Sequence, residues 1–466
     1  MKNKKKILLA MVAAAVMLVA ALAVTIGFLR SREEASGPVQ TLTTDVFAVD
    51  VSQVKALEVY GPDGVKNRIE LNGAYNGTLE GVDPHVELDT MTMSLLVSKF
   101  TNVRTYHDPI QLGEENTLAH YGLENPYGSF IIEQMDGTRT KLLVGDQTVK
   151  KNGYYLCVEG SSQIYVVENA YYEYLQYSRD DFIDKQLAAV DQESGFTITQ
   201  LSIRNRDRDY EAITVRMRFG EYQDNSIYLY EVVEPEYHSG DDYKIHENIF
   251  TYLNPLKGTG VYSLDVSEEN LAALGLAEPQ YILSYINEGV EREFHFAQLP
   301  SGEMVGMKAD GYVVLEMDPA IRNMLEIQVA DVSNAYVLLQ SIAELDAFTV
   351  ADDKNTWNFS LKAEADKLAS VSWNGTELDV EAFRELYSLA MEIKVAGDIP
   401  DPEAKGEHLL NITYHCSDGT VQRMDYYDYD GRYGYVTLND SGRFLVRLSA
   451  IEDFTDCLLT LTGEAA

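Results

Sequence analysis

The strongest constraint on the fold is a short pattern that occurs three times at a long, constant spacing. Residues 54–59, 198–203 and 342–347 each start with Val or Ile, have Leu at the fourth position and place a polar residue fifth. Their first residues follow one another at intervals of 144 positions. Solenoid units repeat every ~20–50 residues, so this spacing corresponds to a whole small domain. The sequence therefore predicts three related modules.

We place these modules at residues 51–190, 191–335 and 336–462. They follow a cytoplasmic tip and membrane anchor at residues 1–29 and a linker at residues 30–50. The chain has 466 residues, of which 45% are hydrophobic, and this is enough apolar material for a core in each module. Three modules on one membrane anchor favour a protein that contacts partners or sets their spacing over an enzyme with a single reaction centre.

Each module reads as an opening strand, a helix and a closing set of strands. Apolar periodicity predicts the first helices at residues 88–100, 249–256 and 379–391, and short final helices at 170–175, 319–325 and 450–459. A strand is expected after each first helix, at residues 103–106, 261–264 and 393–395.

The closing strands alternate apolar and polar residues, which is typical of antiparallel sheets with one buried face. Asp136-Gly137 and Asp418-Gly419 are strong hairpin signals. We expect an α+β fold of three antiparallel sheets, each with one or two packed helices. The expected closing strands are 130–134, 141–144, 154–158 and 164–167 in module 1, 281–285, 292–297 and 312–315 in module 2, and 412–414, 434–438 and 444–446 in module 3.

The phrase Gly-Leu-x-x-Pro recurs in the first two modules, starting at Gly122 and at Gly275. Glycine can supply a left-handed turn, and proline can open an extended segment. In module 3 residues 401–406 take its place and the phrase is missing, so this module has diverged.

The N-terminus predicts a membrane anchor. Lys2 and Lys4 to Lys6 precede an uncharged run from Ile7 to Leu29, which is long enough to cross a bilayer. Basic residues on the N-terminal side place that end in the cytoplasm. We expect a retained signal anchor, with cleavage after its small-residue region as the alternative, and residues 30–466 outside the cell membrane.

Charge and composition narrow the classes of partner. The net charge is −37, from 74 acidic and 37 basic residues, and such a surface repels nucleic acid and anionic lipid headgroups. A solvated surface that keeps an exported protein soluble explains the charge, and weak calcium binding is the alternative. The 31 tyrosines fit strand surfaces, with a sugar- or peptide-binding platform as the alternative.

Three cysteines are too few, and odd in number, for a disulfide framework. Cys157 and Cys416 fall in expected strands and Cys457 in an expected helix. We interpret each as a small buried residue, and a bridge between Cys416 and Cys457 stays open.

None of the common catalytic spacings is found in the sequence. His238, Asp241, Asp242 and His246 form the densest group of ligand-type residues, which we interpret as an exposed polar loop. Residues 428–431 resemble half of a calcium loop, but they lie between two expected strands and predict a hairpin turn. The Gly-x-Gly at 258–260 follows a helix and carries little weight. The sequence therefore predicts no catalytic residue, no cofactor and no metal ligand.

Residues of module 1 closely resemble the domain of unknown function 4340 family. The resemblance rests on Tyr-Gly-Leu-x-x-Pro at 121–126, the Asp-Gly hairpin, Gly145-Asp146, and the Tyr-rich strands at 153–155 and 164–167. It covers residues 54–185, is partial in module 2, where 296–298 replace the Gly-Asp step, and is faint in module 3. The resemblance implies a bacterial envelope protein, often encoded beside ABC-type transporters similar to the gliding-motility system. The family has no established catalytic residues, so the resemblance implies none for this chain.

Two functions are consistent with these features. The first is a membrane-anchored, non-enzymatic accessory protein whose modules bind a transporter subunit or another envelope component. The second is a cell-envelope hydrolase or carbohydrate-binding protein with a site between modules. Converging carboxylates in a deep cleft would favour the second.

The anchor predicts the topology of the chain. Protease added to intact cells that lack a wall should digest the region after residue 30, because that region lies outside the membrane. Digestion is followed by immunoblotting with an antibody to the C-terminus. Full protection under conditions that degrade a known surface protein would contradict the orientation.

Overall fold

The computed structural model describes residues 44–464, except residues 63, 65, 74, 106, 191–196, 218–228, 365, 366, 399 and 441. The chain forms two compact units that divide between Asp184 and Lys185. The expected anchor from Ile7 to Leu29 lies outside the described residues. Within the described ranges, no helix has the length and apolar character that crossing a membrane requires.

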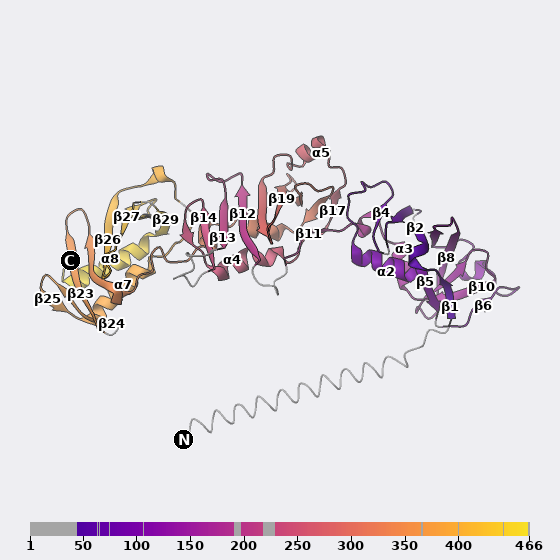
Figure 1. Cartoon of the computed structure of the whole chain (residues 1–466), viewed down its shortest axis with the longest axis horizontal. Helices are drawn as coiled ribbons and strands as arrows, with labels where there is room; N and C mark the ends of the chain where they lie inside the picture. The colour runs from indigo at the N-terminus through magenta and orange to yellow at the C-terminus, as the bar shows by residue number, and fades with distance from the viewer. Residues whose placement is uncertain are drawn as a thin grey trace, which may run out of the picture. The chain divides into compact units, whose positions relative to one another are not determined.

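The first unit holds one eight-stranded antiparallel sheet, here called the first sheet, and a separate pair of strands, β1 and β5 (Figure 1). The order in the sheet is β4-β3-β2-β7-β8-β9-β10-β6. The strands are β1 (Thr44–Ala48), β2 (Val54–Tyr60), β3 (Lys66–Leu71), β4 (Gly77–Leu79), β5 (Asn102–Thr105), β6 (Ile110–Gln111), β7 (Gly128–Gln134), β8 (Arg139–Gln147), β9 (Tyr154–Val158) and β10 (Gln163–Val167); the helices are η1 (Val51–Gln53), α2 (Thr90–Thr101), η2 (Ala119–Tyr121), α3 (Ala170–Leu175) and η3 (Arg179–Phe182).

The second unit begins with a nine-stranded sheet, here called the second sheet. Its order is β15-β14-β13-β12-β18-β19-β20-β21-β17, and β11 and β16 pair separately. The strands are β11 (Gln186–Ala188), β12 (Ile198–Asn205), β13 (Ile213–Met217), β14 (Tyr230–Glu234), β15 (His238–Ser239), β16 (Leu256–Lys257), β17 (Gly260–Ser263), β18 (Tyr281–Asn287), β19 (Val290–Gln298), β20 (Met304–Lys308) and β21 (Val314–Met317); the helices are α4 (Asp242–Asn248), η5 (Phe250–Leu253), α5 (Glu268–Ala273), η6 (Pro319–Ile321), α6 (Arg322–Leu325) and η7 (Val329–Asp331).

The second unit ends with an eight-stranded sheet, here called the third sheet, in the order β25-β24-β23-β22-β26-β27-β28-β29. The strands are β22 (Leu345–Ala351), β23 (Thr356–Glu364), β24 (Lys367–Trp373), β25 (Thr376–Leu378), β26 (His408–Cys416), β27 (Val421–Asp428), β28 (Tyr433–Leu438) and β29 (Gly442–Arg447); the helices are η8 (Ile342–Glu344), α7 (Val380–Glu392), η9 (Pro402–Ala404) and α8 (Leu448–Thr462). The expected mixed α+β fold with antiparallel sheets is therefore confirmed.

The three sheets share one topology. In each, the first long strand (β2, β12 or β22) pairs on one edge with the next strand of the chain. On its other edge it pairs with a strand that lies beyond the first helix in the sequence: β7, β18 or β26. All of these pairings are antiparallel, so a central strand is extended by one meander on each side.

Each central strand carries a β-bulge at the same place. The pairing register shifts between Val54 and Ala56 in β2, between Ile198 and Gln200 in β12, and between Leu345 and Ala347 in β22. An extra residue reverses the alternation of side chains between the two faces. The first residue of each strand and the residue three positions later therefore point into the same core, as their burial confirms.

The positions of the bulges show that the third repeat was predicted to start at the wrong residue. The structural equivalent of Val54 and Ile198 is Leu345, and Ile342 instead begins the one-turn helix η8. Ile342 corresponds to Val51, which begins η1 directly before β2. Large apolar residues stand three positions apart both from Ile342 to Leu345 and from Leu345 to Phe348, so a pattern based on residue type alone was placed three residues too early.

The first helix of each module begins with an aspartate N-cap. Asp89, Asp241 and Asp379 each accept a hydrogen bond from the backbone N–H three residues later. In α2 the buried apolar side chains are Met93, Leu96, Val97 and Phe100, and in α7 Phe383, Leu386, Tyr387 and Ala390 take the same offsets from the cap. An N-cap aspartate contributes about 0.5–2 kcal/mol to helix stability relative to alanine.

The second module differs from the sequence-based expectation in its helix. Residues 249–256 were expected to be helical, but α4 spans Asp242–Asn248 and η5 follows it. Ile245, Ile249 and Leu253 are buried at intervals of four residues. The polar residues Asp242, Lys244 and Asn248 are half-buried and bond to backbone groups of neighbouring segments. This run of polar residues looked like a loop in the sequence.

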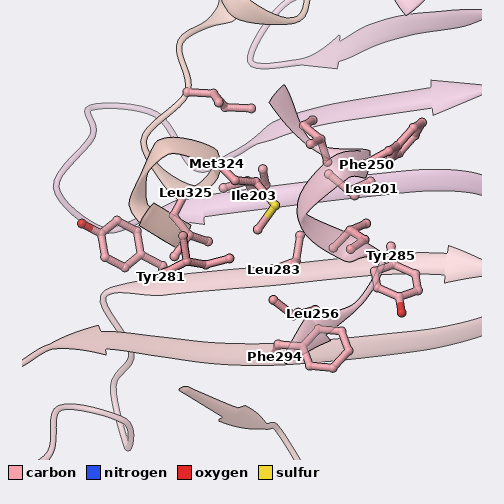
Figure 2. Close-up of a cluster of buried hydrophobic side chains, with 14 of the residues drawn as sticks. Leu201, Ile203, Phe250, Leu256, Tyr281, Leu283, Tyr285, Phe294, Met324 and Leu325 are labelled. Atoms are coloured by element: carbon pink, nitrogen blue, oxygen red, sulfur yellow. The ribbon is translucent and has the colours of Figure 1, made fainter. Parts of the chain in front are cut away.

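The core of the second sheet lies between the strands and these short helices. Figure 2 shows Ile203 of β12 next to Met324 and Leu325 of α6, and Leu201 of β12 next to Phe250 of η5. Phe250 packs edge-on against Tyr230, with ring centroids 5.5 Å apart. Burying each large apolar side chain contributes roughly 1.5–3 kcal/mol, so these short helices are held mainly by tertiary packing.

A second difference is found after α7. Residues 393–395 were expected to form a strand, but they make only isolated bridges, from Lys394 to Tyr336 and from Val395 to Val446. The second bridge joins this segment to β29, and the first joins it to the connection between the second and third sheets. The segment therefore belongs to the junction described below.

The Gly-Leu phrase of module 1 fits against the Gly-Asp step of β8. Gly122 has φ 68°, and a Cβ there would lie 2.5 Å from the carboxyl carbon of Asp146 and 2.8 Å from its backbone nitrogen. A Cβ on Gly145 would overlap the carbonyl oxygen of Tyr121. Leu123, 1% exposed, enters a small apolar cluster on this face of the sheet. The two glycines are thus the two sides of one close backbone contact.

The same phrase is present in looser form in the second sheet. Gly275 has φ 72°, but the nearest atom to its Cβ position is the side chain of Ala297 at 3.5 Å. Leu276 is 2% exposed and enters an equivalent cluster with Ala297 and Val305. Ala297 stands where module 1 has Gly145, and only its Cβ lies within 4 Å of the Gly275 Cβ position, so the close backbone contact of module 1 is not made there.

The second and third sheets are joined by direct contacts within the second unit. The Tyr210 hydroxyl donates to the Asp398 carboxylate at 2.6 and 2.7 Å. Burial, and the carboxylate next to it, raise the pKa of the Tyr210 hydroxyl. The Arg443 guanidinium pairs with Glu236, and the Arg443 backbone N–H donates to the same carboxylate at 2.9 Å.

His238 lies in this junction. Its ring packs edge-on against Phe444, with centroids 4.5 Å apart, and the residue is 4% exposed. Nε2 has no hydrogen-bond partner among the described residues. Burial lowers the pKa of His238 to about 4. The imidazole is therefore neutral at physiological pH and acts as an apolar aromatic contact.

The glycine contact gives a stability prediction. Gly122→Ala should destabilise the first unit by about 1 kcal/mol or more beyond Gly160→Ala. Gly160 also has a positive φ, 82°, but a Cβ there would meet nothing within 4 Å. Gly160→Ala therefore measures the cost of backbone strain at a positive φ in the absence of a steric clash. Calorimetric melting of the full chain measures both variants, and equal losses would remove the close contact as a constraint.

The buried histidine predicts a pH dependence. Because its folded pKa, about 4, lies below the unfolded value of 6.5, the unfolded chain takes up this proton first as the pH falls. The contribution of His238 is complete above pH 6.5 and decreases towards pH 4, by on the order of 3 kcal/mol.

His238→Gln should therefore flatten the fall in melting temperature over this pH range. His246→Gln, on the surface of α4, should keep the wild-type slope. Both tryptophans, Trp357 and Trp373, lie in the second unit, so their fluorescence follows its unfolding. The same slope in wild type and His238→Gln would contradict the buried neutral state.

Candidate binding site

A pocket of about 400 Å³ lies at one end of the third sheet, against α8. It is bordered by the turn after β22, the start of β23, the segment leading into β26, the end of β27 and one face of α8. Three separate stretches of the chain reach this place, at residues 352–357, 407–410 and 428, and the final helix closes it. All of these elements belong to the second unit.

The floor of the pocket is apolar. Trp357 of β23 is 3% exposed, and its indole N–H donates to the Glu464 carboxylate at 2.8 Å. This bond fixes the indole and satisfies its polar group. The rest of the floor comes from β26 and α8, through Leu409, Leu410, Leu448, Ile451 and Leu458.

The rim of the pocket is acidic. Of the described residues that line it, five are carboxylates and none is Lys, Arg or His. Two of the carboxylates are held by their own turns. Asp352 accepts from the backbone N–H groups of Lys354 and Asn355, and Asp428 accepts from that of Gly431.

The other three rim carboxylates are Glu407, Glu452 and Asp456. Among the described residues, their side chains make no ion pair or hydrogen bond, and all three are exposed. These three carboxylates thus carry negative charge that no cation of the described ranges pairs with.

Asp352 is ionised despite its position. Burial opposes its ionisation, but the backbone N–H groups of Lys354 and Asn355 outweigh that effect and lower the pKa of the carboxyl. A carboxylate that accepts two backbone hydrogen bonds is held in the charged form. This side of the rim is therefore anionic at neutral pH.

Glu452 and Asp456 are one helical turn apart on α8 and both face the pocket. Like charges at this spacing destabilise a helix by about 0.2–0.5 kcal/mol. A locally unfavourable arrangement of this kind is often found at functional sites. It was the one local signal of this site in the sequence.

The polar group around residue 240 is not a ligand set. His238 is buried against Phe444, Asp241 caps α4, and Asp242 accepts the backbone N–H groups of Leu229 and Tyr230. His246 lies beside Glu247 on α4, 3.6 Å away. In the described part of the chain, no three His, Cys, Asp or Glu side chains are placed to hold a metal ion.

The other motifs considered in the sequence also have structural roles. Residues 428–431 form the predicted hairpin turn, between β27 and β28, with Asp430 accepting from the Tyr433 N–H. Gly258 packs against Leu315 of β21, where a Cβ would lie 2.7 Å from the Leu315 side chain. Cys157, Cys416 and Cys457 are free thiols, in the expected strands and helix.

A buried charge network in the first sheet is structural. Glu58, 3% exposed, accepts from Arg68 at 2.6 Å, from Arg139 at 3.0 Å and from Tyr60 at 2.9 Å. Lys55 and Arg68 lower the pKa of the neighbouring Glu133 to about 2. These carboxylates are paired with cations of the same sheet, in contrast to the rim of the pocket.

The pocket combines an apolar floor with an acidic rim. Its floor removes apolar surface from water, and its rim attracts cations. Chemically, this arrangement suits recognition of a ligand that carries both an apolar part and a positive charge.

Comparison with known proteins identifies one family. Residues 87–216 match the model of the domain of unknown function family DUF4340. The resemblance seen in the sequence is thus confirmed, with different limits: the match begins just before α2 and continues through β13 of the second sheet. No curated protein and no solved structure matches the chain.

Proposed function

We propose that this chain is a membrane-anchored, extracytoplasmic, non-enzymatic accessory protein that binds a component of an ABC-type transport system. The proposed anchor is the run from Ile7 to Leu29, with the cytoplasm at its N-terminal side. The proposed link to transport rests on what the resemblance to the domain of unknown function 4340 family implies; residues 87–216 match the model of that family. The proposed role is to hold a partner near the membrane.

The pocket of the third sheet is the observation that supports a binding role. Apolar side chains lie at its floor, where water contact is unfavourable, while Glu407, Glu452 and Asp456 face solvent without a cation of their own. Interfaces commonly combine an apolar centre with a charged rim. A partner would cover the floor and neutralise the rim.

The scaffold around the pocket also favours binding. The site is built from strand ends and the fifteen-residue helix α8, and the Arg443–Glu236 and Tyr210–Asp398 contacts attach this sheet to the one before it. Sites on rigid elements are held more accurately than sites on loops. Little ordering of the protein would then be needed when a partner binds.

Chemical crosslinking in intact membranes, followed by solubilisation and mass spectrometry, tests this function. The full chain carries an affinity tag at its C-terminus. Expected is enrichment of a permease or ATPase subunit relative to an unrelated anchored protein. Capture without any transporter component would contradict the transport role.

The purified chain is assayed in parallel for hydrolysis of peptidoglycan and common envelope polysaccharides. We expect no turnover. Turnover that is abolished by changing one carboxylate would replace the accessory function with an enzymatic one.

A further inference from the structure

We propose that the pocket at the end of the third sheet receives a basic, apolar polypeptide segment of the partner. An apolar side chain of that segment covers the floor next to Trp357, and a neighbouring Lys or Arg faces Glu452 and Asp456. The inference rests on the proposed binding function and adds the chemistry of the partner.

Charge complementarity selects the cation. A neutral apolar ligand that covered the pocket would remove water from the rim carboxylates without replacing it. Desolvation of an unpaired carboxylate is costly, so such a ligand would bind weakly. An ammonium or guanidinium group offsets this cost, because it donates hydrogen bonds to the carboxylates of α8.

The size of the pocket favours a short polypeptide segment as its ligand over the surface of a folded domain. Its volume of about 400 Å³ lies at the low end of the range for ligand pockets, roughly 300–1,000 Å³. That space admits a few side chains. The carboxylates are distributed around the rim, on the β22 turn, before β26 and on α8, and an extended or helical segment can reach more than one of them.

Membrane topology would make such a segment distinctive. Short loops outside the cell membrane contain few Lys and Arg residues, since these are concentrated on the cytoplasmic side. A basic segment on the outer side is therefore uncommon, and an acidic pocket would discriminate it from most other loops by charge.

The protein contains a natural reporter for this interaction. Trp357 lies in the floor of the pocket, and Trp373 on β24 is the other indole of the chain. Trp373→Phe leaves Trp357 as the single tryptophan. Titration of the full-length Trp373→Phe protein with a short synthetic peptide that alternates Leu and Lys should change the fluorescence of Trp357 and saturate.

Two probes and two variants test the chemistry. Peptides with Ser or Glu in place of Lys should bind about tenfold more weakly or not at all. Glu452→Gln combined with Asp456→Asn should weaken Lys-peptide binding about fivefold to tenfold and reduce its salt dependence. Glu377→Gln combined with Asp453→Asn removes the same charge from exposed positions outside the pocket and should leave the affinity within about twofold.

Three results would overturn the proposal: equal affinity for the Lys and Ser peptides, equal weakening by the two double variants, or no fluorescence change of Trp357. Equal weakening would indicate attraction by the overall charge. The melting temperature of each variant confirms folding. A transporter subunit that still crosslinks to the Glu452→Gln/Asp456→Asn chain would keep the proposed function and remove only this site.

Discussion

Each sheet of this protein depends on one strand that is hydrogen bonded along both edges and carries one extra residue near its start. The bulge in β2, β12 and β22 turns the first residue of the strand towards the core, so that residues three positions apart become buried together. The helix that follows the first meander then packs on this face, placed by an aspartate cap. The helices, hairpins and loops of each module are arranged around this strand.

Much of this arrangement could be predicted from the sequence, and the failures have physical causes. Alternation of apolar and polar residues gave the sheets, and α2, α3 and α7 were placed within two residues because their apolar stripes are regular. The helix α4 was missed because only Ile245 is buried within it, although Asp241 was a valid cap signal. The spacing of 144 located the first two central strands but missed the third by three residues.

The candidate site could hardly be predicted, because it forms only when distant segments meet. Apart from the one-turn spacing of Glu452 and Asp456, the residues of the pocket have no informative spacing along the chain, and in an acidic sequence no single carboxylate stands out. The residues that did attract attention, around His238, proved to be a cap and a buried aromatic contact. The close backbone contact between Gly122 and Gly145 could not be predicted either, because each glycine had a local explanation as a turn or strand residue.

The junction between the second and third sheets has a mechanical consequence. Tyr210, Glu236 and His238 lie on or beside the strands of one sheet, and Asp398, Arg443 and Phe444 lie on or beside the strands of the next, so the contact has several points of attachment. A single point would act as a pivot, whereas several separated points resist both bending and twisting. A force applied at α8 would therefore be transmitted to the second sheet with little deformation of the junction between the two sheets.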